Sequence, residues 1–304
     1  MSLRRPIALA ALSVLACSIA VLAAPPDPTH ADVAYGSDPN QVLDFYAAPG
    51  DRPAPLVFFM HGGGWVRGNK RPVGHVEKWL AAGLSVVSIE YRMVTQAQAA
   101  AISPPVKWPM EDVARALQFV RSKAAEWKID PARVGVCGGS AGACSTLWLA
   151  FHDDLADPQS ADPVARQSTR VTCAAVIVPQ TSLDPQQMKE WIPNIGYGAH
   201  AFGVSGFTNF LAQRERLLPW IKAYSPYAWV SADDPPVYME FREPPALGKT
   251  QKDATHSANF GVKLQERLRE VGVPCELVHP GVTNPTHATV ADFLIATLRS
   301  PPAP

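Results

Sequence analysis

Gly138-Gly139-Ser140-Ala141-Gly142 is the stretch of this sequence that decides the fold. It fits the pattern Gly-x-Ser-x-Gly, follows an expected strand at 133–137 and opens an expected helix at 141–151. A chain that turns sharply from a strand into a helix holds its central residue in strained backbone geometry, and only small neighbours leave room for the turn. The Ser140 hydroxyl would then project at the carboxyl end of the strand, where it can act as a nucleophile. A glycine-rich turn that binds phosphate is the alternative that this motif alone leaves open.

A second glycine motif, HGGGW at 61–65, follows the apolar run 56–60, which we expect to be another strand. Backbone N–H groups in a glycine run can point into a cleft without obstruction by side chains. Those of Gly63 and Gly64 could therefore hold an oxyanion together with the N–H of Ala141. A flexible loop is the plainer interpretation of one such run. Two such motifs in this order, each after a strand, indicate nucleophilic attack on a carbonyl group.

Apolar runs typical of strands alternate with stretches typical of helices along most of the chain. This alternation predicts an α/β fold with a mostly parallel central sheet and helices on both faces. The stretch 184–232 departs from this alternation of strands and helices, because it lacks a clear strand–helix unit and is rich in aromatic residues. We expect either a cap-like insertion over a pocket or an extra packed layer of helices there. The expected strands are 56–60, 84–91, 133–137, 172–178, 236–241 and 275–278.

Four motifs together resemble the α/β-hydrolase superfamily, in the esterase branch that contains hormone-sensitive-lipase-like enzymes and bacterial feruloyl- or acetyl-xylan-esterase-like proteins. They are HGGGW at 61–65, Glu90-Tyr91-Arg92, Asp112 within PMEDVARALQFV, and GGSAGA at 138–143. The resemblance covers roughly residues 40–300. It implies an α/β-hydrolase fold in a single domain at 25–304, and a serine esterase that needs neither a metal nor a cofactor.

Several residues near these motifs are expected to support the site rather than to react. His61 should hold the glycine loop. Trp65 should either pack beside that loop or line the pocket. Asp112 and Arg92 are expected to be structural partners near the core.

The resemblance implies a catalytic triad in the chain order serine, acid, histidine, with the histidine after the last strand. His279 and His287 lie late enough, and His256 is a third candidate. His287 falls in the loop between the strand 275–278 and the final helix, where the family places its catalytic histidine, whereas His279 stands at the strand end. We therefore expect His287 to act as general base for Ser140 and then as general acid for the leaving alcohol.

The acidic member of the triad is expected to be Asp253. The family usually places an aspartate directly after the strand at 236–241, but a longer loop follows that strand here. Counting back from the expected helix at 258–271 puts Asp253 at the family's position, where it would fix the histidine tautomer and stabilise the imidazolium. Glu243 and Glu240 lie nearer the strand end and are the competing candidates. A solvated loop charge or a helix cap is the plainer interpretation of Asp253.

The amino-acid composition limits the classes of protein to which this chain can belong. The 304 residues are enough for a large α/β domain with a sizeable core. Hydrophobic residues make up 47% and charged residues 18%, which argues against global disorder. Lys+Arg and Asp+Glu both number 27, so the formal net charge is zero and gives no reason to expect a nucleic-acid partner. No spacing of cysteines and histidines suggests a metal site.

Residues 1–24 are typical of a signal peptide. A positively charged start precedes an apolar stretch at 7–22, and small residues stand before Pro25. The apolar stretch is short for a membrane span, and a proline-rich polar segment follows it. We therefore expect cleavage and an exported protein, periplasmic or secreted, with no stable membrane insertion. A permanent anchor and a lipoprotein modified at Cys17 are the alternatives.

The function that these patterns favour is hydrolysis of carboxylic esters through an acyl-enzyme. The resemblance implies small acyl esters as substrates, with polysaccharide-linked esters as an extension by analogy. A serine peptidase of the same superfamily and a non-catalytic binding protein on the same fold are the alternatives. The glycine loop argues against the peptidase, and the presence of Ser140 and His287 argues against the binding protein.

Overall fold

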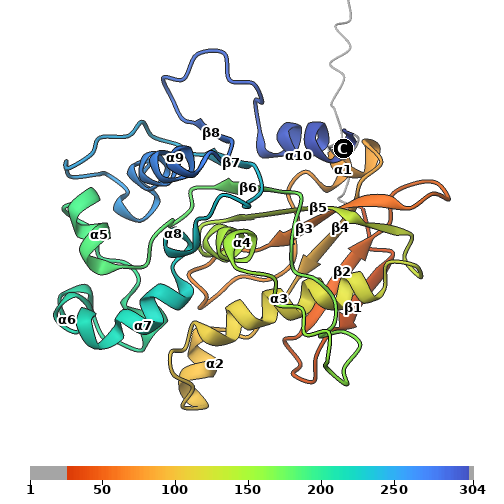
Figure 1. Ribbon diagram of the computed structural model, residues 1–304, viewed down its shortest axis with the longest axis horizontal. Helices are drawn as coiled ribbons and strands as arrows, with labels where there is room; N and C mark the ends of the chain where they lie inside the picture. The colour runs from red at the N-terminus through yellow and green to blue at the C-terminus, as the bar shows by residue number, and fades with distance from the viewer. Residues whose placement is uncertain (1–25, 301–304) are drawn as a thin grey trace, which may run out of the picture.

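A single mixed sheet organises the computed structural model, which describes residues 26–300. Its strands lie in the order β1-β2-β4-β3-β5-β6-β7-β8 (Figure 1). β1 and β2 pair antiparallel, as do β2 and β4, and every other neighbouring pair is parallel. The predicted mostly parallel sheet is therefore confirmed. The strands are β1 (His30–Ala34), β2 (Val42–Tyr46), β3 (Ala54–Met60), β4 (Ser85–Ile89), β5 (Ile129–Gly139), β6 (Cys173–Ile177), β7 (Val237–Glu240) and β8 (Cys275–Val278).

Helices cover both faces of this sheet, as the alternating pattern predicts. Figure 1 shows α1 and α10 on one side of the sheet and α3 and α4 on the other. Between β6 and β7, the stretch 184–232, which departs from the strand–helix alternation, forms α5, η1, α6, α7 and α8. The helices are α1 (Val76–Ala81), α2 (Val94–Ala99), α3 (Lys107–Ser122), α4 (Ala141–Phe151), α5 (Pro185–Trp191), the 3-10 helix η1 (Ala199–Phe202), α6 (Phe207–Ala212), α7 (Arg214–Tyr224), α8 (Pro226–Trp229), the 3-10 helix η2 (Ala254–His256), α9 (Asn259–Val271) and α10 (Val290–Arg299).

The interior strands supply two hydrophobic cores from alternate residues. Phe58 on β3 and Val136 on β5 belong to the larger core, whereas their neighbours Val57 and Cys137 belong to the smaller core beneath α1 and α10. Successive side chains of a strand point to opposite faces of the sheet, so a strand covered on both faces must be apolar at nearly every position. This explains why these strands appear in the sequence as continuous apolar runs.

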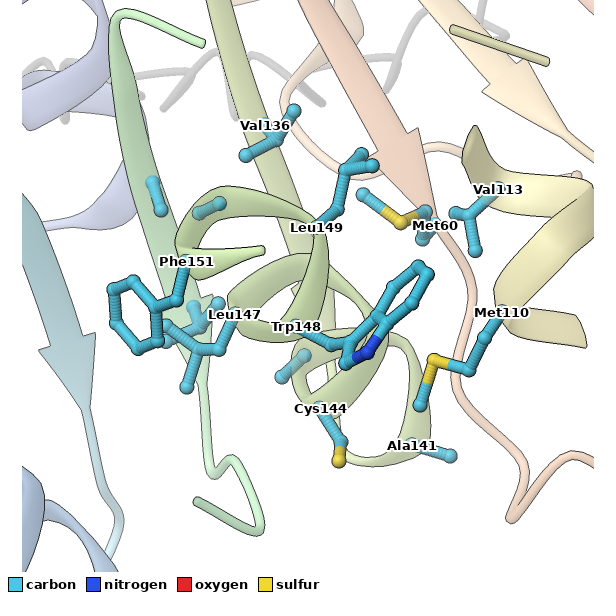
Figure 2. Close-up of a cluster of buried hydrophobic side chains, with 14 of the residues drawn as sticks. Met60, Met110, Val113, Val136, Ala141, Cys144, Leu147, Trp148, Leu149 and Phe151 are labelled. Atoms are coloured by element: carbon cyan, nitrogen blue, oxygen red, sulfur yellow. The ribbon is translucent and has the colours of Figure 1, made fainter. Parts of the chain in front are cut away.

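Helix α4 is the central element of the larger core. All of its residues are buried, and its side chains pack against those of β3 and α3 (Figure 2). A helix that is apolar all round belongs inside a protein rather than on its surface. Its start is pressed against β3, because a Cβ at Gly142 would lie 2.3 Å from the backbone oxygen of Met60. Gly142, the last glycine of the Gly-x-Ser-x-Gly motif, therefore allows the helix to begin directly beside the sheet.

The parallel strands end at one edge of the sheet, which brings distant parts of the sequence together. β3 ends one residue before His61, β5 ends one residue before Ser140, and β7 ends at Glu240. Ligand sites in such sheets lie at the carboxyl ends of the strands. No helix within residues 26–300 is long and apolar enough to cross a bilayer. The expected signal peptide at 1–24, and Cys17 with it, lies outside the described residues.

Candidate active site

Ser140 stands in the sharp turn between β5 and α4 that the glycine motif predicts. Its backbone has φ 54° and ψ −121°, a conformation that residues with side chains rarely adopt. The Ser140 N–H donates a hydrogen bond of 3.0 Å to the carbonyl oxygen of Ile177 at the end of β6. The strained turn is thus anchored to the neighbouring strand, and it presents the hydroxyl at the carboxyl edge of the sheet.

A histidine and an aspartate from one short loop complete a chain of hydrogen bonds to this hydroxyl. The Ser140 Oγ lies 2.9 Å from Nε2 of His256, and Nδ1 of His256 lies 2.8 Å from Oδ2 of Asp253. A carboxylate can only accept, so Nδ1 carries the proton and Nε2 is left free to accept the serine hydroxyl proton. This is the arrangement in which an imidazole acts as general base for a serine.

The structure does not bring His287 to Ser140, so the expectation that His287 is its hydrogen-bond partner is wrong. The His287 ring donates from Nδ1 to Oε2 of Glu276 at 2.7 Å, and its backbone N–H donates to Oε1 of the same side chain at 2.9 Å. Its ring also packs edge-on against Phe293. The carboxylate of Glu276 on β8 thus binds His287, and the ring that contacts Ser140 is that of His256.

The spacing of Asp253 and His256 is the signal that points to this pair. Side chains three residues apart in a 3-10 turn lie above one another, so an aspartate and a histidine at that spacing meet on one side of the turn. Asp253 precedes η2 and accepts from the backbone N–H of His256 as well as from its ring. The other late histidine, His279, bonds the carbonyl of its neighbour Pro280.

Asp253 is held in its charged form. Burial raises the pKa of Asp253, but the hydrogen bonds from His256 and the positive charge that this ring carries when protonated outweigh burial, so the net pKa lies below its ordinary value. Its side chain is about half exposed. Glu243 lines the same cleft and Glu240 ends β7. Within residues 26–300, however, the carboxylate bonded to the His256 ring is that of Asp253.

The glycine loop at 61–65 packs directly against Ser140. A Cβ at Gly62 would lie 3.4 Å from the Cβ of Ser140. The φ angles of Gly63 and Gly64 are +108° and +66°, so both need the freedom of glycine. Ala141 begins α4, where first-turn N–H groups have no acceptor within the helix. The three N–H groups expected to hold an oxyanion therefore belong to the residue after Ser140 and to a loop packed against Ser140.

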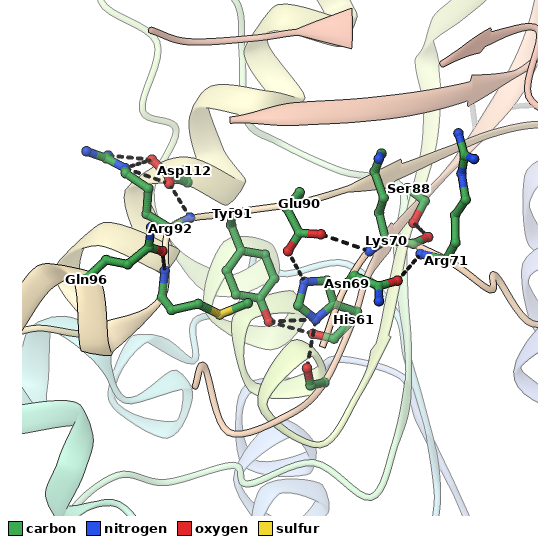
Figure 3. Close-up of polar contacts among 12 residues, drawn as sticks. His61, Asn69, Lys70, Arg71, Ser88, Glu90, Tyr91, Arg92, Gln96 and Asp112 are labelled. Atoms are coloured by element: carbon green, nitrogen blue, oxygen red, sulfur yellow. Dashed lines mark hydrogen bonds and ion pairs between the residues drawn. The ribbon is translucent and has the colours of Figure 1, made fainter. Parts of the chain in front are cut away.

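His61 is held in place by two side chains at the end of β4 (Figure 3). Its Nε2 donates to Oε1 of Glu90 at 3.0 Å. The Tyr91 hydroxyl donates to the His61 carbonyl at 2.8 Å, and the two rings stack with centroids 4.3 Å apart. These contacts fit the expected role of His61 as a support for the glycine loop. Trp65 is fully buried and donates to Oγ of Ser145, so it packs beneath the loop and does not line the cleft.

The segment that carries Glu90 and Tyr91 is anchored in turn by a buried ion pair, also shown in Figure 3. Asp112 on α3 accepts from the Arg92 guanidinium at 2.6 and 2.9 Å and from the Arg92 backbone N–H at 2.9 Å. Gln41 also donates to it, at 2.7 Å. Asp112 is 1% exposed. Arg92 and Asp112 are therefore structural partners, as expected.

Replacing Asp112 with alanine will destabilise the protein by about 3–5 kcal/mol, because it leaves the Arg92 guanidinium without its buried partner. Urea unfolding of the variant and the parent measures this difference. The matched control is Arg115→Ala, which removes the partly exposed ion pair between Arg115 and Asp162 at the surface and should cost about 1 kcal/mol. Equal losses in the two variants would contradict the anchoring role of Asp112.

Ser140 lines a cleft of about 980 Å³. The cleft is bordered by the glycine loop, by the Asp253–His256 turn and by side chains from the segment between β6 and β7. Within residues 26–300 no group of three or more His, Cys, Asp or Glu side chains is placed to hold a metal ion. Residues that line the cleft include His61, Gly63, Gly64, Arg67, Ser140, Ile177, Tyr197, His200, Arg242, Glu243, Asp253 and His256.

Comparison with known proteins adds a family and a set of relatives. Residues 43–242 match the BD-FAE family. Esterase LipC of Mycobacterium tuberculosis (strain ATCC 25618 / H37Rv) is 32% identical over 116 residues, which cover 36% of this chain and 27% of that protein. Esterase LipQ of the same organism is 26% identical over 298 residues, which cover 88% of this chain and 58% of that protein. The chain thus spans 27% and 58% of the lengths of these two curated relatives.

A solved structure supports the fold independently. The acetyl ester-xyloside bifunctional hydrolase from Caldicellulosiruptor lactoaceticus has a TM-score of 0.59 and 23% identity to this chain. The match covers 78% of this chain and 76% of that one. Together with the sheet order, this likeness confirms the predicted α/β-hydrolase fold.

Proposed function

The chain belongs to the BD-FAE family of α/β-hydrolase esterases, and on that premise we propose that it hydrolyses carboxylic esters through Ser140, His256 and Asp253. The observation that carries the proposal is the 2.9 Å contact between Ser140 Oγ and His256 Nε2, because it joins a partly buried serine in a strained turn to a base. The 2.8 Å contact between His256 and Asp253 supports the assignment of the acid.

The chemistry follows from these contacts. His256 removes the hydroxyl proton of Ser140 as Oγ attacks the ester carbonyl, and negative charge develops on the carbonyl oxygen. N–H groups of Gly63, Gly64 and Ala141 receive that charge. His256 then gives its proton to the leaving alcohol, which departs and leaves an acyl group on Ser140. His256 then takes a proton from a water molecule as that water attacks the acyl group. It returns the proton to Oγ of Ser140 as the acyl–Oγ bond breaks, which releases the carboxylic acid and the free serine.

Small acyl esters on carbohydrate are the substrates that we propose for this site. One structural relative is described as an acetyl ester-xyloside bifunctional hydrolase, which gives a precedent on the same fold. The cleft supports the proposal by its size, about 980 Å³, which exceeds what an acetyl group alone requires. Its exposed border carries Arg67, Asn69 and Arg242, side chains that can bond to sugar hydroxyl groups. The proposed place of action is outside the cytoplasm, after removal of residues 1–24.

Labelling with a fluorophosphonate tests the proposal. The probe should form one phosphonyl ester, on Ser140, and mass spectrometry of the digested protein locates it. The parent should also hydrolyse p-nitrophenyl acetate and release acetate from acetylated xylo-oligosaccharides. Cleavage of a peptide p-nitroanilide in preference to these esters would favour the peptidase alternative. A folded protein with neither adduct nor turnover would favour a non-catalytic binding protein.

A further inference from the structure

Gly64, one of the two loop glycines proposed to hold the oxyanion, has the peptide group on each side of it held by hydrogen bonds. The carbonyl of Gly63 accepts from the backbone N–H groups of Val66 and Arg67, each at 3.2 Å. The carbonyl of Gly64 accepts from Nε2 of His200 at 2.9 Å. The bonds before Gly64 thus come from the chain directly after the loop, whereas the bond after Gly64 comes from a side chain 136 residues further along.

His200 is itself fixed in place. It lies in η1, in the segment between β6 and β7, and it lines the cleft. The carbonyl of the next residue, Ala201, accepts from the backbone N–H of Val106 at 3.0 Å, which ties η1 to the start of α3. The His200 ring packs tilted against Trp65 with centroids 6.2 Å apart, and edge-on against Tyr197 at 5.1 Å. The donor to the Gly64 carbonyl therefore belongs to a ring whose position is set by its packing.

The loop needs such an anchor because of the freedom of glycine. Gly64 has a φ of +66°, and glycine loses more conformational freedom than any other residue when it is fixed. Among the described residues, the hydrogen bond to the Gly64 carbonyl is the one from His200. Stabilisation of an oxyanion depends on donors that are oriented before the charge develops. A loop that must reorganise during the reaction gives up part of that stabilisation.

The His200 ring acts through geometry rather than through charge. Burial lowers the pKa of His200, more than its hydrogen bond to Gly64 raises it. His200 is therefore neutral near pH 7 and carries one ring proton. Since a carbonyl oxygen can only accept, that proton stands on Nε2 and is donated to Gly64.

We infer that His200 is a positioning residue, which holds the Gly64 peptide in the orientation that directs the Gly64 N–H toward the oxyanion. This inference rests on the proposed function. The role requires neither a contact between the ring and the substrate nor a proton exchange with Ser140 or His256. Through His200, the segment 184–232 takes part in catalysis as well as bordering the cleft.

Two substitutions of His200 separate the donor from the rest of the side chain. Leucine is similar in volume and has no donor, so His200→Leu should lower kcat for p-nitrophenyl acetate about tenfold, with KM within about twofold of the parent. The rate of fluorophosphonate labelling on Ser140 should fall in parallel. His200→Gln should recover most of the parental kcat, because its side-chain amide is again a donor.

The matched control is His152→Leu. His152 also packs on tryptophan rings, those of Trp148 and Trp229, and its ring also bonds a backbone carbonyl, that of Asp153 at 2.9 Å. It does not line the cleft, so the control should keep the kcat and the labelling rate of the parent. All variants are assayed well below their Tm, so that loss of folded protein does not enter kcat.

Three results would overturn the inference. One is a parental kcat in His200→Leu while the parent is active and labelled on Ser140, which would leave the proposed function standing. Another is an equal loss in His200→Leu and His200→Gln, and the third is an equal loss in His152→Leu. If His200→Leu does not fold, His200→Ala is the donor-free variant, with the same expected loss. A parent without turnover or adduct would instead remove the proposed function, and the inference with it.

Discussion

Replacing Ser140 with alanine will lower kcat for ester hydrolysis by roughly 10⁶-fold. The substitution removes the atom that attacks the carbonyl, and only the oxyanion donors and the binding of the ester remain to accelerate attack by water. The fold should survive, because Ser140 Oγ contacts His256 at the surface of the cleft and α4 stays buried in the core. The strained φ of 54° will persist in alanine, so no gain in stability is expected.

Stopped-flow or long-time assays with p-nitrophenyl acetate measure this loss, and thermal unfolding shows that the variant is folded. Fluorophosphonate should leave the variant unlabelled. A Ser140→Ala protein that keeps more than about a tenth of the parental kcat would contradict the assignment of the nucleophile.

Replacing His256 with alanine will cause a loss of similar size. Without its imidazole, the Ser140 hydroxyl has no acceptor for its proton, and the alkoxide is not formed at neutral pH. The Asp253 carboxylate, left without the ring, cannot take over the contact, because it meets Ser140 only through His256. The loss should therefore appear in kcat rather than in KM.

The double variant Ser140→Ala, His256→Ala separates a shared role from two independent ones. Residues that act as one unit lose their function together, so the double variant should be no slower than either single variant. The kcat of the parent and of the three variants completes the cycle. A further large loss in the double variant would show that His256 contributes by some route other than the activation of Ser140.

The fold could be predicted from the sequence because the motif residues act through local geometry. Only glycine can stand at 142, where a Cβ would meet the Met60 carbonyl at 2.3 Å, and this requirement marks the turn from strand to helix. The apolar runs at 56–60 and 133–137 predict interior strands because both faces of the sheet are covered. These features depend on neighbours in the chain or on the period of the strand, and so they are visible in the sequence.

The partner of Ser140 could not be predicted in the same way, because several histidines follow the nucleophile. The position of His287 in the last loop favours it, yet Glu276 on β8 binds both its ring and its backbone. This contact depends on how the loop at 279–289 folds back on the strand, which no local pattern reveals. The three-residue spacing of Asp253 and His256 is visible in the sequence. The sequence does not show that the turn carrying this pair faces Ser140, and only that placement makes His256 the partner of the serine.

That Tyr197 lines the cleft could not be predicted for another reason. The sequence marks 184–232 as an aromatic-rich departure from the strand–helix rhythm, and it does not tell which aromatic residue enters the cleft. Trp191, for example, is buried against Phe260, away from the glycine loop. The place of Tyr197 in the lining of the cleft depends on the packing of its ring against His200 and Trp65, which no local pattern reveals.

A side-by-side comparison of His256→Ala and His287→Ala tests the central claim most directly. The measurement is the rate of fluorophosphonate labelling at Ser140, followed together with kcat for p-nitrophenyl acetate. If Ser140, His256 and Asp253 form the triad, His256→Ala will lose labelling and turnover, and His287→Ala will retain both within about tenfold after correction for any lost stability. The reverse result, with turnover lost in His287→Ala and kept in His256→Ala, would contradict the account.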